Sequence, residues 1–161
     1  MAATSPRRIG LLANPNAGRS RAAGLAREVT AILAGRGHTV VDLSDPDLAT
    51  ARVRVAAAIA AEEIDVLGVF GGDGTVHHAA ALCAQTSVTL GIVGTGTGND
   101  NARHLGIPGR DSLRVADFLA SAPIRRIDLG RAVTEDGSQW FIGVLGAGFD
   151  TKVNDRGKTL T

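Results

Sequence analysis

Short runs of apolar residues alternate along the chain with segments in which apolar residues recur every three or four positions. Such runs are typical of strands buried on both faces, and the spacing of Leu25, Val29 and Leu33 is typical of one buried helix face. The runs predict strands over 9–13, 38–43, 64–70 and 88–93. The periodic segments predict one helix after Ser20 and further helices over 49–61, 75–84, 99–105 and 111–120. This alternation predicts an α/β fold, a Rossmann-like parallel sheet with helices on both faces.

The pattern changes after Pro123. Residues 124–133 and 140–145 are expected to pair as an antiparallel hairpin around Asp136-Gly137, because no helical segment separates them. We therefore expect residues 1–123 to form one α/β domain. Residues 124–161 are expected to begin a second, β-rich domain that the chain does not complete.

Composition narrows the class of protein. The 161 residues are 44% hydrophobic and 20% charged, close to the globular averages of about 45–50% and about 25%, which excludes a disordered chain. A net charge of +1 without a basic stripe predicts no nucleic-acid partner. The longest apolar run, 66–70, is far shorter than the roughly 20 residues that span a bilayer, and the N-terminus lacks a signal pattern. We therefore expect a cytoplasmic protein.

Glycine is the unusual component, because its 21 residues are roughly twice the share expected from an average near 7%. Two glycine-rich segments, 71–75 and 94–100, each follow a predicted strand and lead into a predicted helix. In an open parallel sheet, ligands bind at this carboxyl edge. Glycine lets backbone N–H groups approach an anion, and a helix N-terminus favours phosphate. The alternative interpretation is a pair of tight strand-to-helix turns.

The two segments bring Asp73 and Asp100 to the same side of the predicted sheet. A pair of carboxylates there suits Mg²⁺ beside phosphates, because Mg²⁺ takes oxygen ligands. In the alternative, one or both aspartates cap the helices that follow. A third polar segment, 14–20, adds backbone amides and Arg19, but no Gly-Lys-Ser/Thr ends it, so it is no Walker A motif. Arg19 either reaches a phosphate or is solvated at the helix start.

With these three segments in place, the chain resembles the diacylglycerol kinase catalytic-domain family of lipid kinases. The match runs in family order over residues 8–150. NAD kinases share the Gly-Gly-Asp-Gly-Thr motif, whereas the later Gly-Thr-Gly-Asn-Asp and Leu-Gly-Ile-Pro motifs are typical of the lipid kinases. The residues that carry the match are 14–19, 71–75, 96–100, 102–103, 105–108 and 127–130.

The resemblance implies ATP-dependent phosphorylation of a lipid alcohol with Mg²⁺ as the metal, and residues 1–123 are then the nucleotide-binding domain. It implies that Asp73 is the catalytic residue acting on the acceptor hydroxyl, and that Asp100 and Asp128 support the metal. The residues that it places around ATP are Asn14, Pro15, Asn16, Ala17, Gly18, Arg19, Ser44, Gly71, Gly72, Gly74, Thr75, Gly96, Thr97, Asn99 and Arg103.

Three features depart from the family pattern. His77-His78 stands where a glutamate usually follows the Gly-Gly-Asp-Gly-Thr motif. The proline that usually precedes Gly-Thr is replaced around Gly94-Thr95, which predicts a looser loop. Family members are about twice as long, and their β-rich second domain forms much of the lipid pocket and supplies another catalytic acid. We therefore expect the 161 residues alone to bind ATP–Mg²⁺ weakly and to turn over little.

Two other functions stay open. A NAD kinase would need an Asn-Glu pair after Gly-Gly-Asp-Gly-Thr, where this sequence has Gly-Thr-Gly-Asn-Asp. A non-catalytic nucleotide-binding module fits the absent glutamate at His78 and the short chain. A lipid kinase would act as a peripheral protein at the inner face of the membrane. The strand predicted over 140–145 has an unpaired edge if its sheet is incomplete, which predicts self-association as a homodimer.

Overall fold

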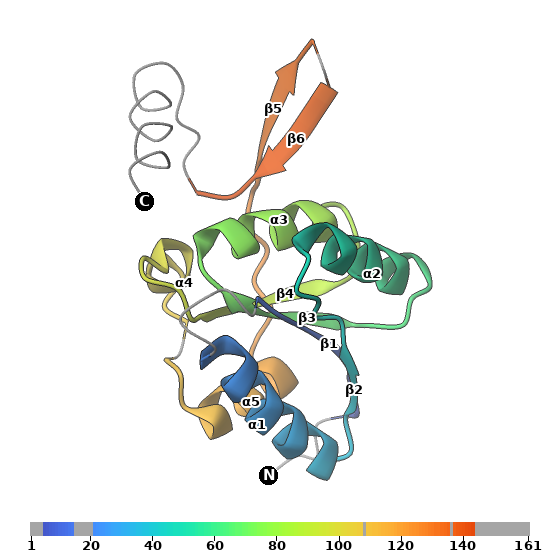
Figure 1. Cartoon of the computed structure of the whole chain (residues 1–161), viewed down its shortest axis with the longest axis vertical. Coiled ribbons are helices and arrows are strands. Elements are labelled where there is room, and N and C mark those ends of the chain that lie inside the picture. The colour runs from blue at the N-terminus through green and yellow to red at the C-terminus, as the bar shows by residue number, and fades with distance from the viewer. Residues whose placement is uncertain (1–4, 15–20, 108, 136, 144–161) are drawn as a thin grey trace.

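Strands and helices alternate through most of the chain, as Figure 1 shows for the computed structural model, which describes residues 5–14, 21–107, 109–135 and 137–143. The elements are β1 (Arg8–Ala13), α1 (Arg21–Gly35), β2 (Thr39–Asp42), α2 (Leu48–Ala60), β3 (Val66–Gly71), α3 (Asp73–Cys83), β4 (Thr89–Gly94), α4 (Asp100–His104), α5 (Ser112–Ser121), β5 (Gly130–Thr134) and β6 (Gly137–Phe141). Each predicted strand and helix of the α/β part is present within about two residues of its expected bounds.

The four strands β1 to β4 form one parallel sheet in the order β2-β1-β3-β4. The two central strands are the most apolar, and every residue of β3 is buried. Helices α1 and α5 cover one face of the sheet, and α2 and α3 cover the other (Figure 1). The predicted Rossmann-like sheet with helices on both faces is therefore confirmed.

Each face of the sheet has its own hydrophobic core. On one side, α1 and α5 bring Val29, Leu33 and Leu119 against Phe70 of β3. On the other side, residues of α2 and α3 pack against the opposite faces of the same strands. Because successive residues of a strand point to opposite faces, the continuous apolar runs of the sequence are needed to supply both cores.

Two glycines in mid-strand let α5 lie close to the sheet. A Cβ atom built on Gly68 of β3 would lie 3.0 Å from Leu119 Cδ1, and one on Gly91 of β4 would also collide with Leu119. Leu119 is only 2% exposed and fills the notch that these two glycines leave. Glycine inside a strand often marks such a close approach.

The last two strands form a separate antiparallel hairpin, with Gly130 opposite Phe141 and Thr134 opposite Gly137. The hairpin extends beyond α3 (Figure 1) and contacts it where Gln139 Nε2 lies 3.2 Å from His77 Nε2. The expected first strand, 124–133, is too long at its start. Residues 124–129 pair with no strand among the described residues, and strand geometry begins only at Gly130, where β6 provides a partner. The second strand is 137–141 instead of beginning at 140, and residues 144 and 145 of the expected strand 140–145 lie outside the described residues.

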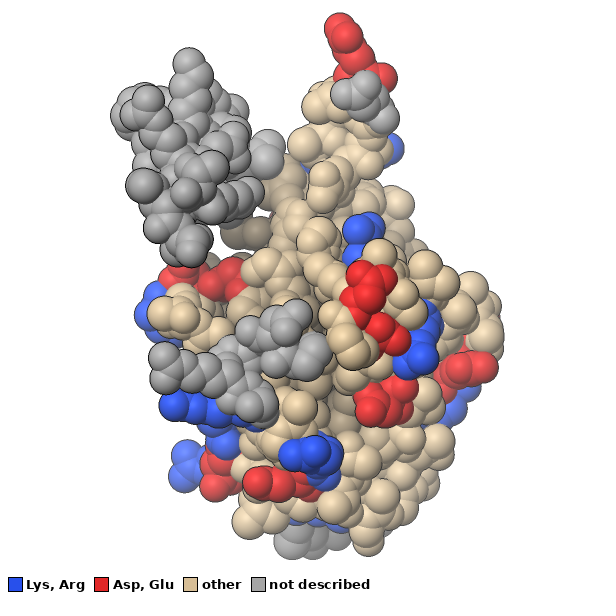
Figure 2. Space-filling model, in the orientation of Figure 1, with Lys and Arg blue, Asp and Glu red and all other residues tan. Residues whose placement is uncertain are grey.

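Within the described ranges, no helix is long and apolar enough to cross a membrane. On the face drawn in Figure 2, acidic and basic side chains are interspersed over the helices. This distribution agrees with the near-neutral net charge of +1.

The Leu119 notch yields a stability prediction. Leu119→Ala should lower the free energy of unfolding by about 2–5 kcal/mol, because it leaves a cavity over two glycines that cannot fill it. Leu113 lies on the same helix but is 56% exposed, so Leu113→Ala should change that free energy by no more than about 0.5 kcal/mol. Urea unfolding of both variants measures the difference. Equal effects would contradict the assigned packing of α5.

Candidate functional site

The strands of the parallel sheet all end at one edge, where the segments singled out in the sequence meet. Strand β2 lies on one side of β1, and β3 lies on the other side. The direction in which successive strands are added to the sheet therefore reverses beside β1. In open α/β sheets, a crevice for ligands forms at such a reversal, outside the carboxyl ends of the strands. The last residues of the four strands are Ala13, Asp42, Gly71 and Gly94.

Side chains join the segments that follow β1 and β3. Asn14 donates from Nδ2 to Thr75 Oγ1 at 3.1 Å, and its backbone N–H donates to Phe70 O at 3.0 Å. Thr75 is 5% exposed and lies against Gly71, where a Cβ atom would be 2.6 Å from Thr75 Cβ. Asn14, Gly71 and Thr75 are therefore brought together as expected.

The N-terminus of α3 carries no side-chain cap. Its N-cap residue is Gly72, in an extended conformation, and the first intrahelical bond runs from Val76 N to Gly72 O. The first-turn N–H groups, from residues 73–75, have no carbonyl within the helix to accept them. A Cβ on Gly74 would meet nothing within 4 Å. An uncapped helix start with open space beside it is suited to an anion.

The loop after β4 packs its backbone on this helix start. Thr95 N donates to Gly71 O at 3.0 Å, which extends the sheet pairing by one residue. A Cβ on Gly96 would lie 2.6 Å from Gly72 Cα and 3.2 Å from Gly72 N. The two glycine-rich loops therefore touch, and only glycine allows an approach this close.

Asn99 holds the second loop in a closed turn. Its Oδ1 accepts from Gly96 N at 2.9 Å, and its Nδ2 donates to Gly96 O at 2.8 Å. Asn99 itself has φ 55° and ψ 40°, a left-handed conformation that asparagine tolerates better than most residues. Thr97 is exposed on the same loop.

The carboxylate of Asp73 caps α4, a helix that begins 27 residues later. Its Oδ2 accepts from Asp100 N at 3.2 Å, and its Oδ1 accepts from Asn101 N and Asn101 Nδ2, both at 3.1 Å. Burial of the carboxyl group raises its pKa, but these hydrogen bonds lower it by more, so the pKa of Asp73 lies below its ordinary value. Asp73 is therefore a helix cap, as the alternative interpretation proposed. The helix that it caps is α4, which follows the second loop, and not its own helix α3.

The carboxylates of Asp73 and Asp100 both lie close to Gly98 of the second loop. A Cβ on Gly98 would lie 2.9 Å from Asp73 Oδ2 and 3.7 Å from Asp100 Oδ2. Two carboxylates placed so are a donor set that Mg²⁺ uses when phosphates and water complete its ligands. Asp100 also pairs with Arg103. Asp128 is exposed on the segment before the hairpin, and no group of three or more His, Cys, Asp or Glu side chains in the described part of the chain could hold a metal alone.

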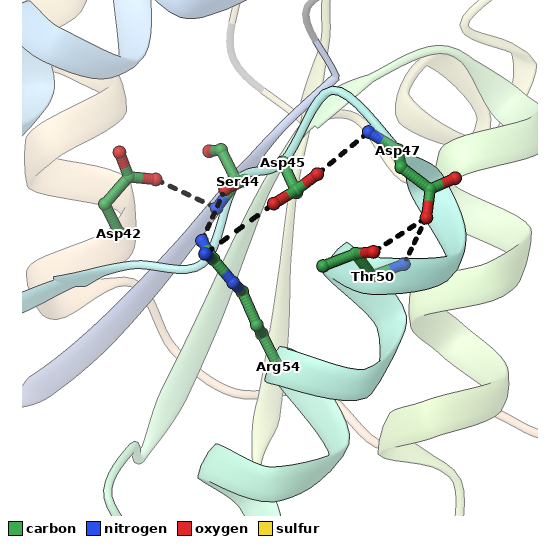
Figure 3. Close-up of polar contacts among 6 residues, drawn as sticks. All are labelled: Asp42, Ser44, Asp45, Asp47, Thr50 and Arg54. Atoms are coloured by element: carbon green, nitrogen blue, oxygen red, sulfur yellow. Dashed lines mark hydrogen bonds and ion pairs between the residues drawn. The ribbon is translucent and has the colours of Figure 1, made fainter.

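Ser44 lies at the end of β2 beside β1, as Figure 3 shows. Its Oγ accepts from Ala13 N at 2.9 Å, and its backbone N–H donates to Asp42 Oδ1 at 2.9 Å. Arg54 of α2 donates to Ser44 O at 3.1 Å and lies 3.6 Å from Asp45 Oδ2. These contacts fix the corner where the chain leaves β2.

The next turn is fixed by the N-cap of α2. Asp47 accepts from Thr50 N at 2.9 Å and from Thr50 Oγ1 at 2.7 Å (Figure 3). The hydrogen bond from the Thr50 side chain, followed by that from the Thr50 backbone, lowers the pKa of Asp47.

Two cavities open at this corner, with volumes of about 250 Å³ and about 170 Å³. The larger reaches Arg27 and Thr30 of α1, and the smaller reaches Asn14 and Thr75. They therefore continue from the α3 start toward α1. The lining that they share is Ala13, Asp45 and Pro46.

Part of the expected site lies outside the described residues, namely Pro15, Asn16, Ala17, Gly18 and Arg19. Two residues at the site were missed by the sequence analysis. Asn101 bonds to Asp73, and Arg110 donates to Gly94 O and Gly96 O. Neither belongs to a periodic or glycine-rich pattern, so no signal in the sequence marks them.

Comparisons with known proteins agree on one family. A family model described as the diacylglycerol kinase catalytic domain matches residues 8–132. The diacylglycerol kinase of Mycobacterium tuberculosis is 38% identical over 154 residues, which are 95% of this chain and 50% of that protein. The diacylglycerol kinase of Bacillus subtilis is 38% identical over 91 residues, which are 55% of this chain and 29% of that protein.

A solved structure shares the fold. The crystal structure of a diacylglycerol kinase from Bacillus anthracis str. Sterne aligns with a TM-score of 0.64 at 25% identity. The alignment covers 78% of this chain and 46% of that one. The chain thus spans about half the length of the Mycobacterium tuberculosis protein and of this structure.

The contact between the loops can be tested with two glycines. Gly96→Ala should lower the free energy of unfolding by about 1–3 kcal/mol, because the new methyl group would overlap the backbone of Gly72. Gly74→Ala, whose methyl group enters open space, should leave it unchanged or raise it by up to about 1 kcal/mol. Chemical unfolding of both variants provides the measurement, and a neutral Gly96→Ala would argue against the loop contact.

The cap at Asp73 predicts a pH dependence of stability. Asp73→Asn should cost about 1 kcal/mol at pH 7, because an amide cannot accept all the hydrogen bonds that the carboxylate accepts. The pKa of Asp73 is lowered on folding from about 3.9, so its contribution is present above about pH 4 and is lost as pH falls through the folded-state pKa.

The measurement is urea unfolding of the unchanged chain and Asp73→Asn between pH 7 and pH 3. The difference between them should shrink below about pH 4. Asp128→Asn, at an exposed carboxylate, is the control and should change the free energy of unfolding little. A difference at Asp73 that grows on acidification would contradict the assigned cap.

Proposed function

The chain belongs to the diacylglycerol kinase catalytic-domain family, and on that premise we propose that it binds ATP and contributes to phosphoryl transfer from ATP to the hydroxyl group of a lipid. Residues 1–123 would form the nucleotide-binding domain. Residues 124–161, which include the β5–β6 hairpin, would begin the domain that receives the lipid.

The observation that carries this proposal is the contact of the two glycine-rich loops around the start of α3. Gly72 offers no side-chain cap, and Gly74 leaves open space beside the first-turn amides. Gly96 brings the second loop within van der Waals contact of Gly72. Phosphoryl transfer asks a protein mainly to position reactants and to offset charge on the phosphate oxygens. The first-turn backbone amides of α3, which no side chain caps, are suited to that task, and the second loop packs against them.

Each loop then has a role. The amides of 72–75 would hold phosphate oxygens, and the bond from Asn14 to Thr75 would keep the loop after β1 in register with them. The cavity beside Ser44 would take the nucleoside, because it continues from Asn14 and Thr75 toward α1. Arg19, outside the described residues, would add a cation, and Thr97 and Asn99 would contribute from the second loop.

Asp73 is the group that we assign to the acceptor hydroxyl. Its carboxylate would take the hydroxyl proton as the oxygen forms its bond to the γ-phosphorus of ATP, and the bond to the β-phosphate oxygen would break to release ADP. Asp100, on the other side of Gly98, would hold Mg²⁺. The metal, when bound, offsets negative charge on the phosphates. Asp128, which is exposed on the segment before the hairpin, would be a further carboxylate of this network.

A second candidate is a nucleotide-binding module without turnover. One observation favours it: the Asp73 carboxylate already accepts three hydrogen bonds, and its pKa is lowered, which makes it a weak base. The same bonds also orient the carboxylate, which a catalytic role requires. Asp73 therefore decides between the two candidates.

The test has two readouts on the same protein. Thermal unfolding with ATP and Mg²⁺ at 100 times the dissociation constant should show a stabilisation of about 2.7 kcal/mol, whereas NAD should give none. Transfer of labelled phosphate to diacylglycerol in mixed micelles should fall by about 10²–10⁴-fold in Asp73→Asn, while ATP affinity stays within a few fold. Asp117→Asn, at an exposed carboxylate of α5 whose ion-pair partner Arg36 belongs to neither loop, is the control.

The outcomes separate the candidates. ATP binding with transfer that depends on Asp73 supports the kinase. ATP binding without transfer to any lipid alcohol, both by this chain and by this chain joined to the second half of a diacylglycerol kinase relative, supports the module. Binding of NAD with phosphorylation of its ribose would support a NAD kinase, and absence of nucleotide binding would contradict all three.

A further inference from the structure

The guanidinium of Arg110 lies across the second glycine-rich loop. Its Nε donates to Gly94 O at 2.9 Å, and its Nη2 donates to Gly96 O at 3.0 Å. Arg110 belongs to the connection between α4 and α5, so it reaches back over 14 and 16 residues to these carbonyls. Two donors on one edge of a planar guanidinium thus bridge the two ends of the Gly94–Gly96 segment.

The loop needs support from outside. Gly94 and Gly96 lie on either side of Thr95, and glycine leaves the backbone more conformations than other residues do. Thr95 is 1% exposed, and its Oγ1 has no hydrogen-bond partner within the part of the chain that the structure describes. A buried hydroxyl without a partner destabilises this conformation of the loop. The Arg110 fork opposes that effect.

A displacement of the second loop would disturb the start of α3 through two contacts. Gly96 is in backbone contact with Gly72, so a shift of Gly96 moves against the N-cap of that helix. The other end of the loop leads into α4, whose first amides bond to Asp73. Both contacts involve groups that the proposed function assigns to phosphate binding and proton transfer.

We propose that Arg110 is a positioning residue, which holds the Gly94–Gly96 carbonyls so that the second loop keeps its place against Gly72 and the nucleotide site is formed before ATP arrives. The effect on ATP rests on the proposed function, whereas the effect on the loop does not. Arg110 does not touch the phosphates in this role, because both of its bridging donors are engaged by loop carbonyls.

The experiment compares Arg110→Met, Arg110→Lys and the control Arg114→Met in the full chain. Methionine keeps much of the apolar stem and removes the donors, and lysine keeps the charge but cannot bridge two carbonyls. Arg114 is exposed at the start of α5, and among the described residues its guanidinium makes no hydrogen bond. Amide hydrogen exchange at Thr95 and Gly96 is measured without nucleotide, and ATP–Mg²⁺ affinity is measured by titration calorimetry.

Arg110→Met should speed exchange at these two amides by about tenfold, with smaller changes at the core strands β1 and β3. It should weaken ATP–Mg²⁺ binding by roughly tenfold, because part of the binding free energy then orders the loop. Arg110→Lys should lie between Arg110→Met and the unchanged chain, and Arg114→Met should match the unchanged chain.

Other results would overturn the proposal. Unchanged exchange at Thr95 and Gly96 would show that Arg110 does not hold the loop, and a loss of ATP affinity in that case would make it a direct phosphate ligand. Faster exchange with full ATP affinity would refute the role in nucleotide binding. If the unchanged chain binds no ATP, the proposed function fails, and the exchange rates alone decide whether Arg110 holds the loop. If Arg110→Met does not fold, Arg110→Lys supplies the same comparison.

Discussion

The backbone contact between Gly72 and Gly96 is the constraint on which the site depends. These residues follow neighbouring parallel strands, and a Cβ atom on Gly96 would lie 2.6 Å from Gly72 Cα. The pairing of β3 with β4 brings the two loops to one edge, and the missing side chains let them touch. Because of this contact, the start of α3 and the loop before α4 form one packed surface instead of two separate turns.

The carboxylate of Asp73 links the start of α3 to the start of α4. It lies in the first turn of α3, where a helix dipole favours a carboxylate, and it accepts hydrogen bonds from the first turn of α4. One carboxylate therefore serves the N-termini of two helices. The same hydrogen bonds lower its pKa and fix its direction. A fixed, ionised carboxylate beside an anion site is useful when a neighbouring cation offsets the charge, which is consistent with the proposed Mg²⁺ beside Asp100.

The β5–β6 hairpin is separate from the two glycine-rich loops, but it contacts α3, the helix that begins at the first of them. Gln139 of β6 lies beside His77 of α3, one turn after the glycine-rich start of that helix. His77 is one of two adjacent histidines after the Gly-Gly-Asp-Gly-Thr motif, and the structure places it at the junction between the α/β part and the hairpin. The expected self-association through this region stays a prediction.

The sequence by itself determined the parallel sheet, the helices on both of its faces and the position of both glycine-rich loops, because these follow from local periodicity and from where glycines interrupt it. It left open whether Asp73 caps a helix, and it predicted a strand over 124–129, which pairs with no strand in the described part of the chain. Only the tertiary structure decided that Asp73 caps α4 and that Arg110 spans Gly94 and Gly96. These contacts join residues 14 to 28 positions apart, and their distances depend on how helices pack on the sheet, which no local pattern encodes.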